Sequence, residues 1–221
     1  STGKLKNVDK VLTSKQVKLL KKAEKSDKPV IIITEKEAKE NEKKKAKDTK
    51  TWIFEADSVR DFAFASSRKF IWDAMIHNQP GAKYAQVLAM SFYPNEAEPI
   101  WSHYSTHSVI HTMEVYSRFS FDYPYPTAQS VNSWKSGGME YPMITLVDRM
   151  VLPEDLDVVI AHEVGHNWFY GILAFNERDF PWMDEGINSY YERMYKENFY
   201  PNLDRGFLPK KMESKGQLDL M

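Results

Sequence analysis

The chain has 221 residues, of which 42% are hydrophobic and 28% are charged, and none is cysteine. These fractions are typical of an ordinary globular protein, and the chain is long enough to bury at least one sizeable core. The absence of cysteine excludes disulfides and leaves only nitrogen and oxygen ligands for any zinc site. No apolar run approaches the roughly 20 residues that cross a bilayer, so the sequence predicts no transmembrane segment in this chain.

The charge is unevenly distributed along the chain. Residues 1–50 contain 16 lysines against 8 acidic residues, although the net charge of the whole chain is only −1. A lysine-rich run can bind nucleic acid or an anionic membrane surface. Here the lysines alternate with Glu and Asp, and no aromatic residues are interleaved to stack on bases. We therefore expect a solvated segment and no nucleic-acid partner.

Apolar spacing and turn residues predict a series of helices and strands. In the first half we expect a helix over 15–25 with Ser14 as its N-cap, a buried strand over 30–33, an exposed helix or loose insertion over 35–50, strands within 51–56 and 59–66, and a strand over 85–93. In the second half we expect a helix over 101–118, extended or turn backbone at 124–126, a turn at 137–138 feeding a strand over 143–147, and helices from 153 to about 170 and from about 184 to 198. Strands and helices in separate blocks favour the α+β class.

A candidate metal site lies on the helix predicted from residue 153. His162 and His166 are four residues apart, so at 3.6 residues per turn both imidazoles lie on one face and can reach one ion. Glu163 lies next to that face. This H-E-x-x-H arrangement is typical of zinc binding with the glutamate as general base. A helix with two partly buried histidines and an ion-paired glutamate has the same pattern, so the motif needs support from elsewhere in the chain.

Glu185 is the candidate third ligand. It follows His166 by 19 positions and lies at the start of the next predicted helix, and an antiparallel helix can return a carboxylate over that distance. Two histidines and one glutamate leave the fourth position of a catalytic zinc open for water. Glu185 could instead satisfy the helix dipole, as Asp184 equally could, and Glu177 is a competing ligand.

Two segments carry a family resemblance. HEVGHNWFYG at 162–171, followed by WMDEGINSYYE at 182–192, resembles the zinc signature of the aminopeptidase N family within the gluzincins. Gly-Gly-Met-Glu at 137–140, 22 positions before the first histidine, resembles that family's Gly-x-Met-Glu-Asn motif. An ordinary turn before a strand is the alternative for this second motif. The resemblance covers roughly residues 51–200.

The resemblance implies a role for each of these residues. One Zn²⁺ ion would be held by His162, His166 and Glu185, with Glu163 as the general base of peptide hydrolysis. Glu140 would bind the free α-ammonium group of the substrate, so that its distance from zinc measures off a single N-terminal residue. The substrate would lie along the backbone of the same motif, at Gly137, Gly138 and Met139.

The sequence departs from the family pattern in two places. Tyr141 and Pro142 follow the motif glutamate where the family usually has Asn, which affects the geometry of amine recognition. Relatives also carry a tyrosine, roughly sixty residues past the third zinc ligand, that hydrogen-bonds the tetrahedral intermediate; that position lies beyond Met221. Loss of one such donor costs roughly a hundredfold to a thousandfold in rate. We therefore expect this chain to bind zinc with weak or no activity, and the full-length parent to be the enzyme.

Three further histidines could form a second metal site. His103, His107 and His111 recur every four residues on the helix predicted over 101–118. No carboxylate is suitably interleaved, and the resemblance gives these residues no role. We expect them to be a polar flank of that helix.

The sequence therefore predicts an α+β, thermolysin-like catalytic domain over 51–221, truncated on its C-terminal side. Residues 1–50 would be a lysine-rich segment at the end of an N-terminal β-domain. The predicted function is a zinc-dependent aminopeptidase acting on peptides with a free N-terminus. A gluzincin endopeptidase and a non-catalytic, zinc-stabilised peptide-binding module stay open as alternatives. Oligomeric state is not indicated, and for the compartment we favour a bacterial periplasmic, extracellular or membrane-associated location over the cytoplasm.

Overall fold

The computed structural model describes residues 1–46, 48–133, 137–148, 150 and 152–201. Its N-terminal elements are β1 (Lys4–Leu5), α1 (Val8–Val11), α2 (Ser14–Ala23), β2 (Val30–Ile33), α3 (Glu35–Lys43) and β3 (Phe54–Glu55). The elements that follow are β4 (Ile71–Asn78), β5 (Gln86–Tyr93), η1 (Asn95–Ala97), α4 (Ile100–Phe119), β6 (Thr127–Asn132), β7 (Gly138–Tyr141), β8 (Ile144–Val147), α5 (Pro153–Phe169), η2 (Pro181–Met183) and α6 (Glu185–Phe199).

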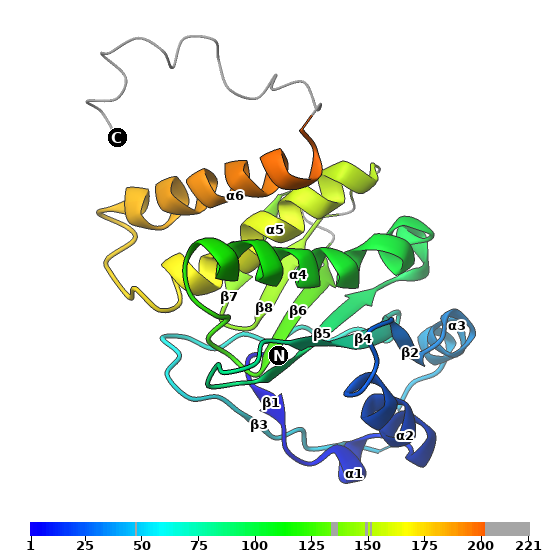
Figure 1. The fold of residues 1–221 in the computed structure, drawn as a ribbon. Coiled ribbons are helices and arrows are strands. Elements are labelled where there is room, and N and C mark those ends of the chain that lie inside the picture. Colours follow the sequence, from blue (N-terminus) through cyan, green and yellow to red (C-terminus); the bar gives the residue numbers. More distant parts are fainter. Residues whose placement is uncertain (47, 134–136, 149, 151, 202–221) are drawn as a thin grey trace, which may run out of the picture.

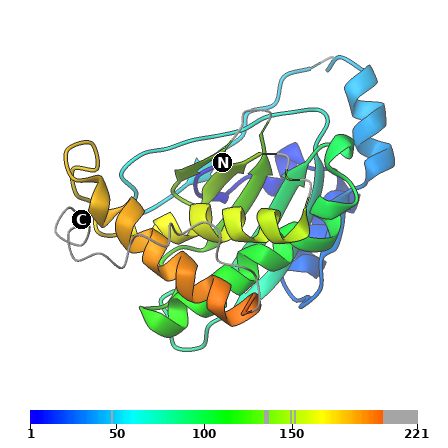
Figure 2. The same cartoon turned by 90° about the horizontal axis from the view of Figure 1, so that it is seen from above.

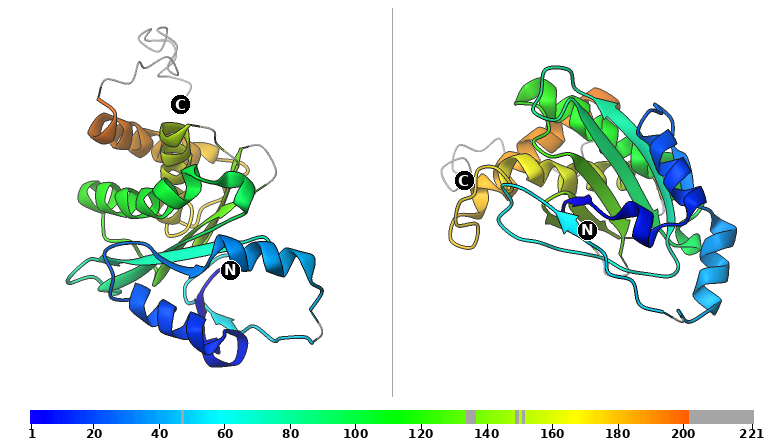
Figure 3. Two further views of the ribbon diagram at one scale, coloured as in Figure 1. Left: turned by 90° about the vertical axis from the view of Figure 1, so that its right-hand side faces the viewer. Right: turned by 90° about the horizontal axis from the view of Figure 1, so that it is seen from below.

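A six-stranded mixed sheet forms the centre of the molecule, with strand order β2-β4-β5-β6-β8-β7. β5, β6 and β8 run parallel, and the remaining neighbours are antiparallel. Helices α4, α5 and α6 lie over one face, whereas α1, α2 and the small β1–β3 pair lie under the other (Figures 1 and 3). This is a mixed fold of helices and a sheet, in agreement with the expected class at that level.

Two apolar clusters hold these layers together. The larger cluster fills the space between the sheet and the upper helices, and its fully buried aromatic side chains include Trp101, Tyr116, Trp168 and Tyr195. The smaller cluster joins α2 to the lower face of β2, β4 and β5. Full burial of a large apolar side chain stabilises a fold by roughly 1.5–3 kcal/mol. The helices above the sheet are therefore held mainly by packing.

The N-terminal cap of α2 corrects one expectation. Ser14 is the first helical residue, and Thr13 caps the helix instead. The Thr13 hydroxyl accepts the backbone N–H of Gln16 at 3.3 Å, and the Gln16 side chain accepts the backbone N–H of Thr13 at 2.9 Å. A capping box needs a polar side chain three residues after the N-cap. Gln16 is in that position relative to Thr13, whereas the apolar Val17 is in that position relative to Ser14.

The helix predictions are confirmed: α4, α5 and α6 each begin and end within one residue of the expected bounds. The predicted insertion at 35–50 contains the helix α3. The strand predictions hold only in part. Those over 30–33 and 85–93 correspond to β2 and β5, but within 51–66 only Phe54–Glu55 is a strand. The side chains of Phe62 and Phe64 are 55% and 75% exposed, so they are not packed in the core.

Two further differences concern the strands around the candidate site. The turn expected at 137–138 is instead the entry to β7, and the chain turns at Pro142 and Met143 before β8. No pattern in the sequence analysis indicated β4 or β6. Both run through the middle of the sheet, where even polar side chains such as Asp73 and Gln129 are buried.

The topology brings three elements to one end of the sheet. β7 is the edge strand beside β8, α5 packs across both strands, and α6 packs on α5. Figure 2 shows the upper helices from above, with α5 (yellow) beside α6 (orange). The two helices and the edge strand that carry the candidate residues are thus neighbours.

Residues 1–50 are joined to the rest of the sheet by β2, which pairs antiparallel with β4 from Val30 opposite Ala74. The domain boundary at residue 50 stays a prediction. Over the described residues, none of the helices has the length and apolar character needed to span a bilayer.

Candidate metal centre

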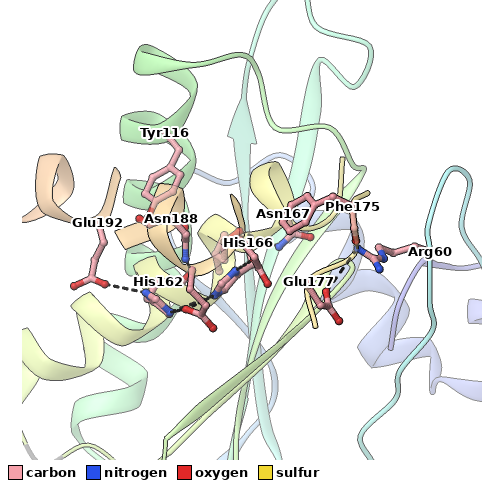
Figure 4. Close-up of polar contacts among 12 residues, drawn as sticks. Arg60, Tyr116, His162, His166, Asn167, Phe175, Glu177, Asn188 and Glu192 are labelled. Carbon is pink, nitrogen blue, oxygen red and sulfur yellow. Dashed lines mark hydrogen bonds and ion pairs between the residues drawn. The ribbon is translucent and has the colours of Figure 1, made fainter. Parts of the chain in front are cut away.

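The two histidines of α5 point their Nε2 atoms toward a common point. His162 and His166 are separated by one helical turn, and their Nε2 atoms are 3.2 Å apart. His166 is almost fully buried, at 1% exposure, whereas His162 is partly exposed. One face of α5 therefore presents two nitrogen donors side by side (Figure 4).

Glu185, the first residue of α6, joins this pair. Its Oε2 lies 3.3 Å from Nε2 of His162 and 3.8 Å from Nε2 of His166. In a tetrahedral zinc site with ligand bonds of about 2.1 Å, ligand atoms stand about 3.4 Å apart. The three measured separations are close to that value, so the donor set fits one divalent ion in both chemistry and spacing.

The outer nitrogens of both imidazoles bind carboxylates, which the sequence analysis did not anticipate. Nδ1 of His162 lies 2.8 Å from Oε2 of Glu192, and Nδ1 of His166 forms a hydrogen bond with Asp184. A carboxylate on the outer nitrogen keeps the proton there and fixes the ring orientation, so that the inner nitrogen faces the ion. Glu192 follows Glu185 by two helical turns, a spacing that could have indicated its position on the same face.

A buried amide secures α6 against α5. The Nδ2 group of Asn188 donates to the carbonyl of His162 at 2.7 Å, and its Oδ1 accepts from the Tyr116 hydroxyl at 3.2 Å. Gly165 makes room for this contact, because a Cβ at that position would lie 2.2 Å from Oδ1 of Asn188. The two helices that carry the candidate ligands are thus joined by a buried amide and a close approach at glycine.

The carboxylates around the histidines dominate their protonation. Burial acts to lower the pKa of His162, but hydrogen bonds to Glu185 and Glu192 outweigh it and raise the pKa to about 10. The pKa of His166 is also raised, because Asp184 outweighs the effect of burial. The pKa of Glu185 is lowered by its hydrogen bond to His162. This cluster of negative charge favours a bound cation.

Glu163 is buried at 6% exposure beside the histidines. Its Oε2 has no hydrogen-bond partner among the described residues. Burial raises the pKa of this carboxyl group to about 7. β7 passes close above it: a Cβ added to Gly138 would lie 2.0 Å from Oε1 of Glu163. A glycine at this position therefore allows the edge strand to approach the carboxylate.

Glu140, on the same edge strand, approaches the other side of the site. A ligand atom from each of Glu140, Glu163 and His166 lies within 4.8 Å of the other two. Burial raises the pKa of Glu140. Met139, next to it, is 41% exposed, and Gly137 adopts a φ of 94°, which favours glycine. The predicted motif at 137–140 thus lies beside the histidines.

Glu177, the competing ligand candidate, lies elsewhere. Its Oε2 is 3.6 Å from the guanidinium of Arg60, which also donates to the carbonyl of Phe175 at 3.1 Å. Figure 4 shows this group apart from the two histidines. Glu177 fastens the loop before Glu185 to residue 60 and is not brought to the site.

The three histidines of α4 are not brought together as a metal site among the described residues. Nδ1 of His103 contacts the carbonyl of Pro99 at 2.6 Å. The ring of His111 stacks on Phe199 with centroids 4.6 Å apart. These contacts agree with the expected polar flank of a helix.

Comparison with known proteins gives consistent matches. Residues 72–221 match the model of the peptidase family M1 domain. Aminopeptidase Q of Mus musculus is 32% identical over 98 residues, covering 38% of this chain and 18% of that protein. Leukotriene A-4 hydrolase of Xenopus laevis is 36% identical over 77 residues, covering 34% of this chain and 13% of that protein. The chain spans less than a fifth of the length of these curated relatives.

Solved structures also match part of the chain. Aminopeptidase A of Legionella pneumophila, in complex with aspartic acid, matches with a TM-score of 0.52 and 14% identity, over 59% of this chain and 17% of that one. The M1 zinc metallopeptidase of Deinococcus radiodurans matches with a TM-score of 0.47 and 18% identity, over 57% of this chain and 29% of that one. At such identity the first of these matches speaks for the fold alone.

Proposed function

The chain belongs to peptidase family M1, and from this premise we propose that it forms part of a zinc-dependent aminopeptidase that removes N-terminal residues from peptides. The family match confirms the resemblance to aminopeptidase N-like metallopeptidases, which are zinc-dependent hydrolases of peptides. The thermolysin-like architecture, the division at residue 50, the residue roles and the preference for a free N-terminus belong to the proposal.

One observation supports the proposal above all others: the spacing of the three donor atoms. Nε2 of His162, Nε2 of His166 and Oε2 of Glu185 are separated by 3.2, 3.3 and 3.8 Å. We assign these three residues as the ligands of one zinc ion. Three protein ligands leave a coordination position open, as in catalytic zinc sites. Glu192 and Asp184 would orient the two imidazoles.

In the proposed reaction, a bound zinc ion supplies a Lewis acid that polarises the scissile carbonyl and acidifies water. Glu163 is the general base: its carboxylate takes a proton from the attacking water and later delivers it to the leaving amine. The close approach of Gly138 shields this carboxylate from solvent on one side. A structural zinc site needs no such base, which disfavours the peptide-binding module.

Glu140 is the proposed anchor for the amino terminus. Its half-buried carboxylate lies within 4.8 Å of ligand atoms of both Glu163 and His166, so an ammonium group bound there would hold the first peptide bond next to the general base. β7 is an edge strand, and we propose that its free edge at the exposed Met139 forms hydrogen bonds with the substrate main chain. This arrangement favours an aminopeptidase over an endopeptidase of the same clan.

The test compares aminoacyl substrates with their N-acetylated versions, using the full-length protein that carries this chain. We expect cleavage of the free amines only, because acetylation removes the charge that pairs with Glu140. Equal cleavage of both forms would identify an endopeptidase. Retention of zinc without any cleavage would identify a binding module.

A further inference from the structure

The turn between β7 and β8 holds a non-glycine residue in a strained conformation. Met143 adopts a φ of 66°, in the left-handed region that such residues rarely occupy. Pro142, which precedes it, fixes φ near −65°. This pair of φ values is that of a type II turn, whose third position normally takes Gly or Asn. Met143 therefore needs stabilisation from its surroundings to keep this conformation.

Two buried amide side chains supply that stabilisation. The backbone N–H of Met143 donates to Oδ1 of Asn167 at 2.9 Å, and its carbonyl accepts from Nε2 of Gln129 at 3.1 Å. Nδ2 of Asn167 donates to the carbonyl of Val164 at 2.9 Å, which fixes the orientation of the amide. Asn167 and Gln129 are each 3% exposed, and Met143 is 1% exposed. The turn is thus clamped from both sides, away from water.

Asn167 connects this turn to the metal helix, because it directly follows His166 on α5 (Figure 4). The turn ends the hairpin on which Glu140 faces Thr145. The contact between Asn167 and Met143 is therefore a direct tie between the helix with two donor nitrogens and the hairpin with the proposed amine anchor. A shift of this hairpin would move Glu140 relative to both histidines.

We propose that Asn167 is a positioning residue, which sets the distance between the amine anchor Glu140 and the metal centre by clamping the turn at Met143. The proposal rests on the proposed function, since it assigns a purpose to the position of Glu140. It also explains why Met143 occupies a position where glycine would adopt the same backbone conformation without strain. The strain is tolerated because the turn is held at one exact place.

The experiment measures binding of Ala-Ala-Ala and of N-acetyl-Ala-Ala-Ala to the full-length protein, in a Glu163→Gln background that prevents turnover. Asn167→Leu removes both side-chain hydrogen bonds at nearly constant volume. We expect the preference for the free amine to fall by about tenfold or more, the size of effect that follows loss of a charge-assisted contact, while zinc content per chain is unchanged.

The matched control is Thr112→Val, which removes a buried hydrogen bond of 2.7 Å to the carbonyl of Ser108 in α4, away from the hairpin. It should leave the amine preference intact. An Asn167→Leu protein that keeps its preference overturns the inference. If that variant fails to fold, Gln129→Leu tests the clamp from the carbonyl side of Met143, and an unchanged preference there also overturns it. Absence of any preference in the Glu163→Gln background itself would instead refute the proposed amine site.

Discussion

The imidazoles of His162 and His166 each have a carboxylate on the nitrogen that faces away from the proposed ion. Glu192 holds the first ring at 2.8 Å, and it also forms an ion pair with Lys196. Such outer partners set ring orientation and basicity, and their removal typically weakens metal binding by about 10-fold to 100-fold. We therefore expect these carboxylates to contribute to zinc affinity without touching the metal.

We expect Glu192→Ala to weaken zinc binding by about 10-fold to 100-fold, measured by competition with a chelator, because the ring of His162 loses its orienting partner. Glu192→Gln should be milder, since an amide oxygen can still accept from Nδ1. The matched control is Glu197→Ala on the same helix, whose partner is the exposed Arg193. Equal zinc affinity in wild type and Glu192→Ala would contradict this role.

For individual residues of the site, the sequence predicted the contacts that depend on local spacing. His162, Glu163 and His166 are set by one helical turn, so their juxtaposition follows from the sequence. The partner of Glu177 was not predictable, because Arg60 reaches it from 117 positions earlier in the chain. The hydrogen bond between His166 and Asp184 was not predictable for a different reason. A carboxylate at the start of a helix also interacts favourably with the helix dipole, so its presence there does not indicate a histidine partner.

The elements around the site approach each other more closely than ordinary side chains permit. β7 passes over α5 at Gly138, where a Cβ would lie 2.0 Å from Oε1 of Glu163. We expect Gly138→Ala to displace the strand or the carboxylate, leaving zinc content unchanged but lowering turnover by the full-length protein about 100-fold, because misplacement by about 1 Å has such effects.

Gly186→Ala is the matched control for this substitution. It lies next to Glu185 on α6, yet among the residues that the structure describes its Cβ would meet only Trp182 Cβ, at 3.7 Å, which is ordinary contact. Alanine is also the better helix former. Turnover should therefore be unchanged there, and wild-type turnover in Gly138→Ala would refute the proposed close fit.

The accuracy of the element predictions reflects how each element is buried. α4, α5 and α6 are long and periodic, so their bounds were predicted closely. β4 is buried over seven consecutive residues, with Asp73 and His77 among them, so it shows neither alternation nor a purely apolar run. β6 reads as polar, yet Gln129 and Ser130 are buried because each has a hydrogen-bond partner. Pairing with neighbouring strands, and not a local sequence pattern, therefore determines that these two segments are strands.

The molecule as a whole carries a buried polar network beneath α4. Asp73, at 2% exposure, accepts hydrogen bonds from the hydroxyl of Tyr93 at 2.6 Å and from Thr106. Burial raises the pKa of Asp73 to about 6, against the opposing effect of these two hydroxyls. The unfolded chain has a pKa of about 3.9 at such a residue, so the native state binds more protons between these values.

This network predicts a pH dependence of stability. As pH rises from 5 to 7, Asp73 ionises in the native state at a cost, and its contribution to the free energy of unfolding falls by about 1 kcal/mol. Asp73→Asn removes that contribution. Denaturant titrations of both proteins at pH 5, 6 and 7 give their free energies of unfolding. Between pH 5 and pH 7 we expect the variant to gain about 1 kcal/mol relative to wild type. A difference that is constant with pH would contradict the assignment.

The division of the chain at residue 50 stays a prediction, and composition alone does not show how residues 1–50 pack. Their lysine-rich character indicated a solvated segment, and β2 within it pairs with β4 in the central sheet. Charge on the outer face of a segment does not reveal what its buried face touches. Here Ile32 is fully buried while Ile31 beside it is 48% exposed.

We assign three residues from two helices as the ligands of one zinc ion, and the zinc content of the purified chain is the decisive measurement of this assignment. We expect one zinc per chain in wild type and in Glu177→Ala, and loss of zinc from Glu185→Ala after dialysis against a chelator of moderate affinity. Zinc retained equally by Glu185→Ala, or lost from Glu177→Ala instead, would contradict the account.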